Sequence, residues 1–248
     1  NNIEELKKSF KNFCLNIPFH GRIFANGDSL EVLDVIENLP RNVTSYGFSE
    51  INDFQISDFS QNKNGSEFSL LNKSNKKKMK FKTNMIGRHN VSNTVAAIIV
   101  ALDEGISYED IKDSLEKFIV IERRFQLISE KVFNKDIVLI DDYGHHPNEL
   151  SVSINTVKEV WPERKLLVVF QPHRYTRTKA LFQEFIDILA SCENLILLEV
   201  YPASESPIPN YESENLIREI HKKNPSAKLV NGIEEAYLSL IHISEPTR

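Results

Sequence analysis

Two polar segments of the chain carry side chains that could bind an anion and move a proton. The first, residues 141–147 (DDYGHHP), follows the apolar run 137–140, and the second, residues 171–177 (QPHRYTR), follows the apolar run 166–170. Each segment leads into a helical pattern, so we expect both at the carboxyl edge of one parallel sheet, where open α/β folds bind ligands. Three of the chain's seven histidines lie in these two segments. The sequence therefore predicts a site that attracts anions.

Arg174 and Arg177 lie where a helix is expected to begin. A positive charge there opposes the helix dipole, which favours anions at that end. The arrangement makes sense if a ligand carboxylate or phosphate lies between the two guanidinium groups and the free N–H groups of the helix. The alternative is a pair of surface arginines that form ion pairs with Asp141, Glu184 or Asp187.

The first segment contains two pairs of identical neighbours, and we expect one residue of each pair to face the ligand crevice at the edge of the sheet. His145 and His146 precede Pro147, which suits the first position of a helix because it has no N–H. One imidazole could orient an amine or hydroxyl group or accept its proton, and the alternative is a histidine that caps its own helix. Asp141 and Asp142 alternate across the strand end, so only one can accept a hydrogen bond from a ribose hydroxyl or a metal-bound water.

Two further groups lie outside these segments. Asn90 and Asn93 are one helical turn apart, with His89 at the mouth of the helix, and one such amide could read the edge of an adenine. N-capping of the helix is the alternative. Arg123 and Arg124 lie at the inferred domain boundary, where one of them could reach a phosphate when domains close. A salt bridge within the linker is the alternative.

The first half of the chain predicts a βαβ unit followed by antiparallel hairpins. The expected elements are a helix over 3–13, a strand over 22–26, a helix over 29–39, a strand over 43–48, hairpins between 54 and 83, and an apolar helix over 95–102. A further helix opens at Ser107 and places Ile111, Leu115 and Phe118 on its inner face. These two helices are expected to close the first domain.

The second half alternates strands and helices, which predicts an α/β fold with a parallel, doubly wound sheet. The expected strands are 136–142, 165–171, 194–200 and 227–231, and the expected helices are 147–161, 177–190, 212–223 and 233–240. The last eight residues, 241–248, continue neither pattern. We expect them to be a non-native tail and leave them out of the fold prediction.

The composition excludes several classes of protein. The chain has 248 residues, of which 41% are apolar and 26% charged, as in ordinary globular domains. A formal net charge of −5 argues against a nucleic-acid partner. Cys14 and Cys192 form no disulfide framework and no zinc-ligand spacing. Because no apolar run approaches the roughly 18 residues of a membrane span, we expect a cytoplasmic protein without a membrane partner.

Taken together, the segments resemble the Mur ligase family. The matching stretches are residues 46–50, 87–90 with Asn93, 123–125, 141–147, 170–178 and 198–203. So many ordered motifs in the right spacing make a chance resemblance implausible. The resemblance implies that residues 1–122 are the C-terminal portion of a central ATP-binding domain. Residues 123–240 would then be a truncated, Rossmann-like C-terminal domain that binds an amino acid.

The resemblance also implies a reaction of peptidoglycan precursor synthesis. An ATP- and Mg²⁺-dependent ligase would phosphorylate the lactyl carboxylate of UDP-N-acetylmuramate and join the acyl phosphate to L-alanine. The stretch 170–178 is typical of the members that add alanine. The residues expected around L-alanine are Tyr143, His145, His173, Arg174 and Arg177. Those expected around ATP are His89, Asn90 and Asn93 at the adenine, Asp142 at the ribose and Arg124 at the phosphates. His145 and Arg124 are expected to be catalytic.

The chain also departs from the family pattern. It contains no G-x-x-x-x-G-K-S/T loop, so the triphosphate cradle, the ligands of the metal and the UDP-binding domain are expected to lie outside it. We therefore expect a fragment that is inactive alone. The family usually has a glycine in place of Val120 and an acidic residue in place of Gly27. The alternatives are a recycling ligase that attaches a preformed peptide and a non-catalytic module that binds a nucleotide or an amino acid.

Overall fold

The computed structural model describes residues 3–119, 121–132, 135–232 and 234–236. The chain forms two compact units, of which the first ends at Asp141 and the second begins at Asp142. Each unit has its own hydrophobic core and is described by itself. Within the described ranges, no helix combines the length and the apolar character that a membrane crossing requires.

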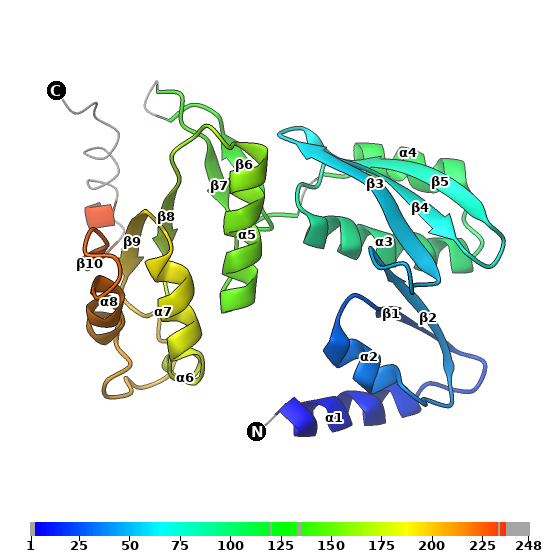
Figure 1. Ribbon diagram of the computed structural model, residues 1–248, viewed down its shortest axis with the longest axis horizontal. Coiled ribbons are helices and arrows are strands. Elements are labelled where there is room, and N and C mark those ends of the chain that lie inside the picture. Colours follow the sequence, from blue (N-terminus) through cyan, green and yellow to red (C-terminus); the bar gives the residue numbers. More distant parts are fainter. Residues whose placement is uncertain (1–2, 120, 133–134, 233, 237–248) are drawn as a thin grey trace. The chain divides into compact units, whose positions relative to one another are not determined.

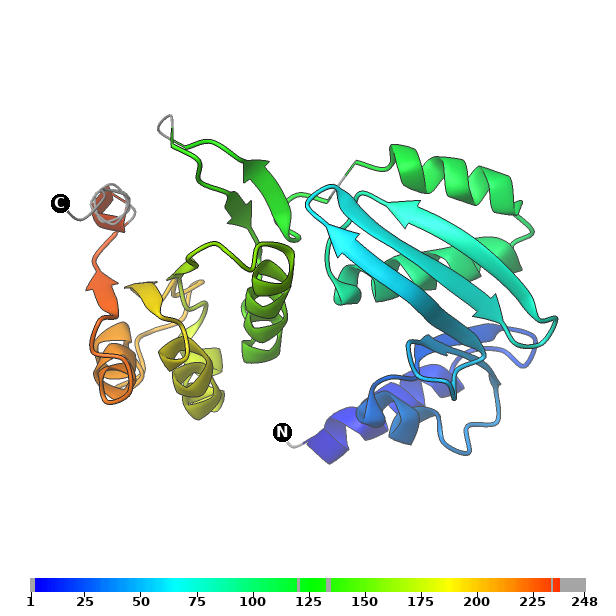
Figure 2. The same cartoon turned by 45° about the horizontal axis from the view of Figure 1, so that its top comes forward.

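Unit 1 is built on a five-stranded mixed sheet in the order β1-β2-β3-β4-β5 (Figure 1). Its elements are α1 (Ile3–Leu15), β1 (Arg22–Asn26), α2 (Leu30–Ile36), β2 (Asn42–Gly47), β3 (Phe54–Asn62), β4 (Gly65–Asn72), β5 (Lys77–Thr83), α3 (Arg88–Asp103) and α4 (Tyr108–Lys117). Strands β1 and β2 are parallel, as the predicted βαβ unit requires. Strands β3, β4 and β5 form the predicted antiparallel hairpins, which Figure 2 shows as neighbouring curved strands.

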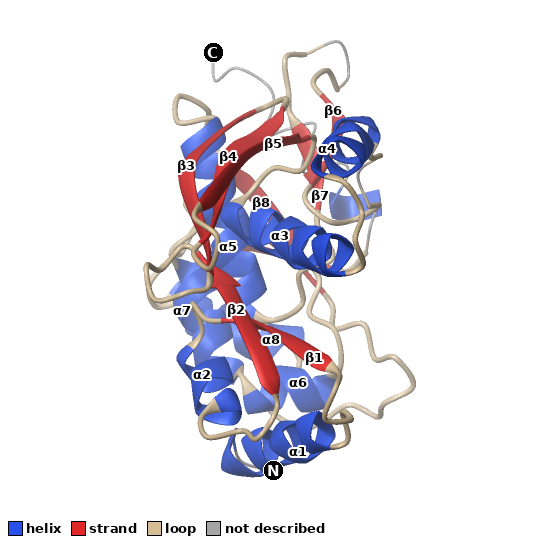
Figure 3. Ribbon diagram, turned by 90° about the vertical axis from the view of Figure 1, so that its right-hand side faces the viewer, coloured by secondary structure: helices blue, strands red, loops and turns tan. Residues whose placement is uncertain are grey.

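Helix α3 packs on one face of this sheet and supplies much of the core of unit 1 (Figure 3). Its buried apolar residues are spaced by three or four positions, as an amphipathic helix requires. They are Val91, Val95, Ile98 and Ile99, and they pack against Ile56, Phe68, Leu70, Met79 and Phe81 of the hairpins. The helix begins earlier than predicted, at Arg88, because Gly87 serves as the N-cap. The N-terminus of α3 thus lies beside the turns that follow β1 and β2.

Helix α4 begins as predicted, because the Ser107 hydroxyl accepts a hydrogen bond from Asp110 N at 3.2 Å. Ile111 is buried and Leu115 packs against the core. The prediction for Phe118 is wrong: it lies past the end of the helix and is 43% exposed. The helix ends at Lys117, one residue before Phe118, so this ring is not carried on its inner face.

Unit 2 contains a parallel sheet in the order β10-β9-β8. Its elements are α5 (Pro147–Val160), β8 (Leu167–Phe170), α6 (Tyr175–Ala180), α7 (Phe182–Ala190), β9 (Asn194–Leu198), α8 (Ser213–His221) and β10 (Lys228–Val230). In β9, Leu195 and Leu197 pack into the core made with α5, α7 and α8, whereas Ile196 and Leu198 pack against β10 on the other face. This burial on both faces is what a doubly wound sheet requires.

Two predictions for this half of the chain are wrong. The strand expected over 136–142 is shorter, β7 (Leu139–Asp141), and it pairs antiparallel with the unpredicted β6 (Gln126–Ser129) in a separate two-stranded sheet. The four-residue β6 is too short and too polar for an alternation pattern to reveal it. The helix expected over 177–190 begins at Tyr175 and is broken at Leu181 into α6 and α7.

Two other predictions concern residues at the C-terminal end. Of the helix expected over 233–240, the structure describes only residues 234–236, which are helical. The tail expected over 241–248 lies outside the described residues. The domain boundary expected after residue 122 stays a prediction, and the two compact units meet in sequence at Asp141 and Asp142.

Candidate functional site

The predicted alanine-binding residues of unit 2 lie near one another. Tyr143 contacts His145 edge to face, with their ring centroids 5.5 Å apart, and His173 lies 6.5 Å from Tyr143 and 6.3 Å from His145. Arg177 contacts His173 directly. Together with Arg174, we name these five residues the histidine–arginine cluster. Its members come from the segment after β7 and the segment after β8.

The segment after β8 is held in place by the segment after β9. Tyr201 N donates to Pro172 O at 2.8 Å, and Arg174 N donates to Tyr201 O at 2.9 Å. His173 and Tyr201 thus form an isolated parallel bridge beyond the end of the sheet. Parallel pairing therefore continues past β8 and β9 and fixes the backbone on which His173 and Arg174 sit.

His173 and Arg177 form a defined pair. The Arg177 guanidinium donates to His173 O at 3.1 Å and to His173 Nδ1 at 3.3 Å. Since arginine can only donate, Nδ1 carries no proton and the neutral ring presents Nε2–H. Desolvation lowers the pKa of His173 below its ordinary value, and the positive charges of Arg177 and Arg174 lower it further. The ring is therefore a neutral hydrogen-bond donor at pH 7.

Arg174 is the N-cap of α6 and adopts a φ of 72°, in the left-handed region. Its backbone turns the chain sharply into the helix. Among the described residues, neither Arg174 nor Arg177 forms an ion pair. Of the partners expected under the surface-arginine alternative, Asp141 pairs with Arg123 and Asp187 pairs with Lys223.

The prediction that the N–H groups at the start of α6 are free is wrong in one respect. Glu205 accepts a hydrogen bond from Thr176 N at 2.9 Å and another from Thr176 Oγ1 at 2.7 Å. These bonds lower the pKa of Glu205, and the nearby charge of Arg174 adds to the effect. A carboxylate of the protein thus takes the helix terminus, so a bound anion would depend on the two guanidinium groups.

The two histidines of the first segment have different surroundings. His146 is the N-cap of α5 and accepts from Asn148 N at 3.2 Å, while Glu149 accepts from both histidine N–H groups of the backbone. His145 Nδ1 lies 3.1 Å from Tyr143 O. A carbonyl only accepts, so Nδ1 carries the proton and Nε2 is left as the basic nitrogen of the neutral ring. His146 therefore has the capping role of the alternative, and the role in orienting or deprotonating a substrate stays a prediction for His145.

In the doublets Asp141–Asp142 and Arg123–Arg124, the two neighbouring residues also have different partners. Arg123 forms the salt bridge, with its Nε 3.3 Å from Asp141 Oδ2. Arg124 has an exposed side chain and, among the described residues, no ion pair. Asp142 Oδ1 accepts from Gly144 N at 2.7 Å, which shapes the turn toward His145. Arg124 is thus available to a phosphate, and one oxygen of Asp142 is already engaged.

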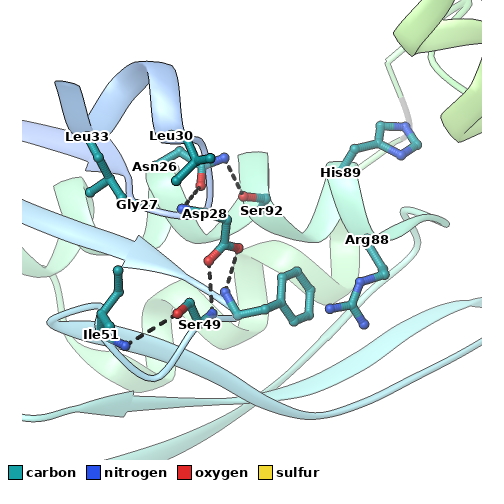
Figure 4. A pocket seen from close by; sticks show the side chains of 11 residues that line it. Asn26, Gly27, Asp28, Leu30, Leu33, Ser49, Ile51, Arg88, His89 and Ser92 are labelled. Atoms are coloured by element: carbon teal, nitrogen blue, oxygen red, sulfur yellow. Dashed lines mark hydrogen bonds between the residues drawn. The ribbon is translucent and has the colours of Figure 1, made fainter. Parts of the chain in front are cut away.

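Unit 1 contains a cavity of about 560 Å³, which we name the Asp28 pocket (Figure 4). It is lined by the turn after β1, the turn after β2 and the mouth of α3. Asp28 holds the two turns together, since its carboxylate accepts from Phe48 N at 2.7 Å and Ser49 N at 2.8 Å. The Arg88 guanidinium lies 3.7 Å from the centroid of the Phe48 ring, a cation–π contact. His89 also lines the pocket.

The predicted adenine-binding residues on α3 are not equivalent. Asn90 is 3% exposed and its Nδ2 donates to Ile86 O at 2.8 Å, so this amide stabilises the start of its own helix. Asn93 is exposed. Neither is the N-cap, which is Gly87. Asn93 is therefore exposed, His89 is half-buried, and the amide of Asn90 has a structural hydrogen bond.

Sequence reasoning missed two residues that shape these sites. Asp28 follows β1 and Tyr201 follows β9, so both obey the rule that polar or aromatic residues after a buried strand lie at the sheet edge. That rule identified the segment after residue 170 and would have found these two as well. The prediction that the segment after residue 140 lies at the edge of the same parallel sheet is wrong, because β7 pairs antiparallel with β6 in a separate sheet. Among the described residues, no group of three His, Cys, Asp or Glu side chains could hold a metal ion.

Comparisons with known proteins define the class. The family model of the Mur ligase middle domain matches residues 1–101, and that of the Mur ligase glutamate ligase domain matches residues 123–247. The chain belongs to the Mur ligase family. The resemblance found in the sequence is confirmed.

Within the family, a curated relative is the UDP-N-acetylmuramate--L-alanine ligase of Wigglesworthia glossinidia brevipalpis, which is 40% identical over 225 residues. The match covers 88% of this chain and 47% of the relative, so the chain spans about half the length of that protein.

Two solved structures share the fold. The UDP-N-acetylmuramate-alanine ligase MurC of Thermotoga maritima has a TM-score of 0.68 at 20% identity, over 100% of this chain and 50% of that one. MurF of Acinetobacter baumannii has a TM-score of 0.72 at 17% identity, over 97% of this chain and 49% of that one. At these identities the likeness shows the fold alone, and it confirms the predicted α/β class.

Proposed function

We propose that this chain supplies nucleotide-binding residues and the amino-acid site of an ATP-dependent ligase that joins L-alanine to the lactyl carboxylate of UDP-N-acetylmuramate. The observation that carries the proposal is the histidine–arginine cluster, in which two guanidinium groups adjoin two imidazoles and form no ion pair with any described residue. The named Wigglesworthia relative supports the choice of substrates.

The cluster has the chemistry that a small amino acid needs. Arg174 and Arg177 bind its carboxylate through charge-assisted hydrogen bonds, and His173 adds its Nε2–H as a neutral donor. Tyr143 and the two imidazoles form a wall beside the bound molecule, which favours a small side chain. Glycine and serine remain the natural competitors to test.

His145 serves as the base. Its Nδ1 proton is turned to Tyr143 O, so Nε2 accepts a proton from the alanine ammonium group and leaves the amine lone pair free. The amine attacks the carbonyl carbon of the acyl phosphate that ATP forms on the lactyl carboxylate. The tetrahedral intermediate collapses, the new C–N bond remains, and phosphate leaves with the C–O electron pair and takes up the second proton that the attacking nitrogen loses as the amide forms.

The nucleotide contacts follow the family resemblance. His89 and Asn93 meet the adenine side of ATP, with Asn90 fixing the helix that carries them, and the carboxylate of Asp142 meets the ribose. Arg124 meets the terminal phosphates. The Asp28 pocket is large enough for a nucleoside, which fits this assignment. ATP supplies the phosphoryl group and Mg²⁺ neutralises its charge, with ligands that come from outside this chain.

The test uses a completed ligase, in which residues 1–236 of this chain replace the matching segment of the Wigglesworthia relative. We expect this protein to form UDP-N-acetylmuramoyl-L-alanine, ADP and phosphate in equal amounts. The 248-residue chain alone should form none, because it has no phosphate-binding loop. Activity of the 248-residue chain alone would contradict the prediction that the phosphate-binding loop is needed and lies outside this chain.

The neighbouring histidines provide a matched pair of variants. His145→Ala should lower kcat by about 10²–10⁴-fold, the usual contribution of a general base. His146→Ala removes only a helix cap and should leave kcat within about threefold, with a stability loss of about 1 kcal/mol. Equal losses of kcat in the two variants would contradict the role given to His145.

A further inference from the structure

Tyr201 contacts the histidine–arginine cluster but has no part in the reaction described above. Its ring stacks on the His173 imidazole, with centroids 5.3 Å apart and planes inclined by 25°. The ring is 51% exposed, so it contributes little to the core of unit 2. Burial of apolar surface therefore does not explain why this aromatic side chain stacks on His173.

The backbone places Tyr201 there with little freedom. It is bridged to His173 in parallel register, and its N–H and C=O bond to Pro172 and Arg174 on either side. Its position relative to His173 is therefore set by main-chain hydrogen bonds. The side chain then limits the rotation of the imidazole, because turning the ring of His173 would break the stacking.

We propose that Tyr201 is a positioning residue of the amino-acid site: its ring holds the His173 imidazole in the orientation that orders the Arg177 guanidinium. The sequence of contacts is short. Tyr201 stacks on His173, His173 accepts from Arg177 at Nδ1, and Arg177 is left with its remaining N–H groups for a carboxylate. The inference rests on the proposed function, which makes that carboxylate the one of L-alanine.

The charges around His173 explain why such a support is useful. Arg177, Arg174 and His145 all disfavour protonation of the ring, and Glu205 opposes them, while Tyr143 and Tyr201 are uncharged neighbours. A protonated Nδ1 would lose the bond to Arg177. By covering one face of the imidazole from water, Tyr201 helps to keep it neutral, in addition to fixing its plane.

The kinetic test compares three variants of the completed ligase. Tyr201→Ala should raise the KM for alanine about threefold to tenfold, the range expected for losing an aromatic pair, and leave the KM for ATP unchanged. Tyr201→Phe keeps the ring and should restore the KM for alanine. Tyr211→Ala, which removes a tyrosine packed on Phe182 in the same unit, should not change it.

The second readout is the pKa of His173, measured by NMR in the 248-residue chain. Tyr201→Ala should raise this pKa toward its ordinary value of 6.5, and Tyr201→Phe should not. Tyr201→Leu, which keeps apolar volume without a flat ring, serves if the alanine variant does not fold, and should show the same two effects.

An unchanged His173 pKa together with an unchanged KM for alanine in Tyr201→Ala or Tyr201→Leu would overturn the inference. So would a phenylalanine variant as impaired as the alanine variant. If Arg177→Ala raises the KM for alanine and Tyr201→Ala does not, the inference fails and the proposed function stands. If the completed ligase does not use alanine at all, the proposed function fails, and the pKa of His173 still shows whether Tyr201 positions it.

Discussion

The histidine–arginine cluster of unit 2 and the Asp28 pocket of unit 1 are built in opposite ways. In the cluster, the side chains proposed to bind or react with the substrate contact one another. Main-chain hydrogen bonds from Tyr201 to Pro172 and Arg174 fix the backbone that carries His173. In the pocket, polar groups bond to the protein itself: Asp28 accepts from two backbone N–H groups, and Asn26 accepts from Asp28 N. The polar side chains of the cluster are thus placed to contact a substrate, whereas those of the pocket hold the turns around it in place.

This difference leads to separable effects of mutation. Changes in the pocket should act first on the stability of unit 1, because its polar groups hold turns together. Changes in the cluster should act on substrate binding with little effect on stability, because its arginines form no ion pairs among the described residues. The predictions below test this contrast, beginning with the largest effect on stability.

Gly27→Ala should destabilise unit 1 by about 1–3 kcal/mol, the usual range for overpacking. A Cβ at Gly27 would lie 2.0 Å from Asn52 Oδ1. Asn52 is fully buried and cannot move aside without losing the bonds from its Nδ2 to Asp28 Oδ1 and Ser49 O. Thermal or urea unfolding measures the effect. Gly232→Ala is the control, since no described residue other than its chain neighbours has an atom within 4 Å of the added Cβ. Equal stability of the two variants would show that the pocket tolerates movement.

The two asparagines of α3 should give different defects. Asn90→Ala should lower the stability of unit 1 by about 1 kcal/mol, because Ile86 O loses its buried donor. Asn93→Ala should leave stability unchanged and raise the KM of the completed ligase for ATP by about fivefold, as expected for one lost hydrogen bond. Unfolding curves and ATP kinetics on both variants measure this. A loss of ATP affinity with Asn90→Ala alone would reverse the assignment.

The smallest effect is a pH dependence at the start of α6. The pKa of Glu205 is lowered by its bonds to Thr176, so its contribution to order is present above its ordinary value of 4.5 and is lost as the pH falls through the lower folded value. The protection factor of the Thr176 amide, which is its intrinsic exchange rate at a given pH divided by the observed rate, should therefore fall below about pH 4.5. In Glu205→Gln, the exchange should show no such transition. A transition that persists in the glutamine variant would assign the effect to another group.

Much of this molecule could be predicted from its sequence. The βαβ unit, the hairpins and the parallel strands β8 to β10 follow from hydrophobic period, and the histidine–arginine cluster follows from polar residues placed after apolar runs. The pairing of β7 with β6 could not be predicted, because a three-residue strand carries no information about its partner. Each doublet left two readings open, since sequence does not say which neighbour the backbone turns inward. His146 caps α5 and Arg123 pairs with Asp141, which leaves His145 and Arg124 available.

The central claim is that Arg174 and Arg177 bind the carboxylate of the incoming amino acid, and steady-state kinetics of the completed ligase test it directly. Arg174→Ala and Arg177→Ala should each raise the KM for alanine by about 10- to 100-fold, equivalent to about 1.5–3 kcal/mol for a charge-assisted hydrogen bond, with the KM for ATP unchanged. Arg218→Ala, a surface arginine of α8, should change neither constant. Equal increases in the KM for alanine and for ATP, or no increase in either, would contradict the account.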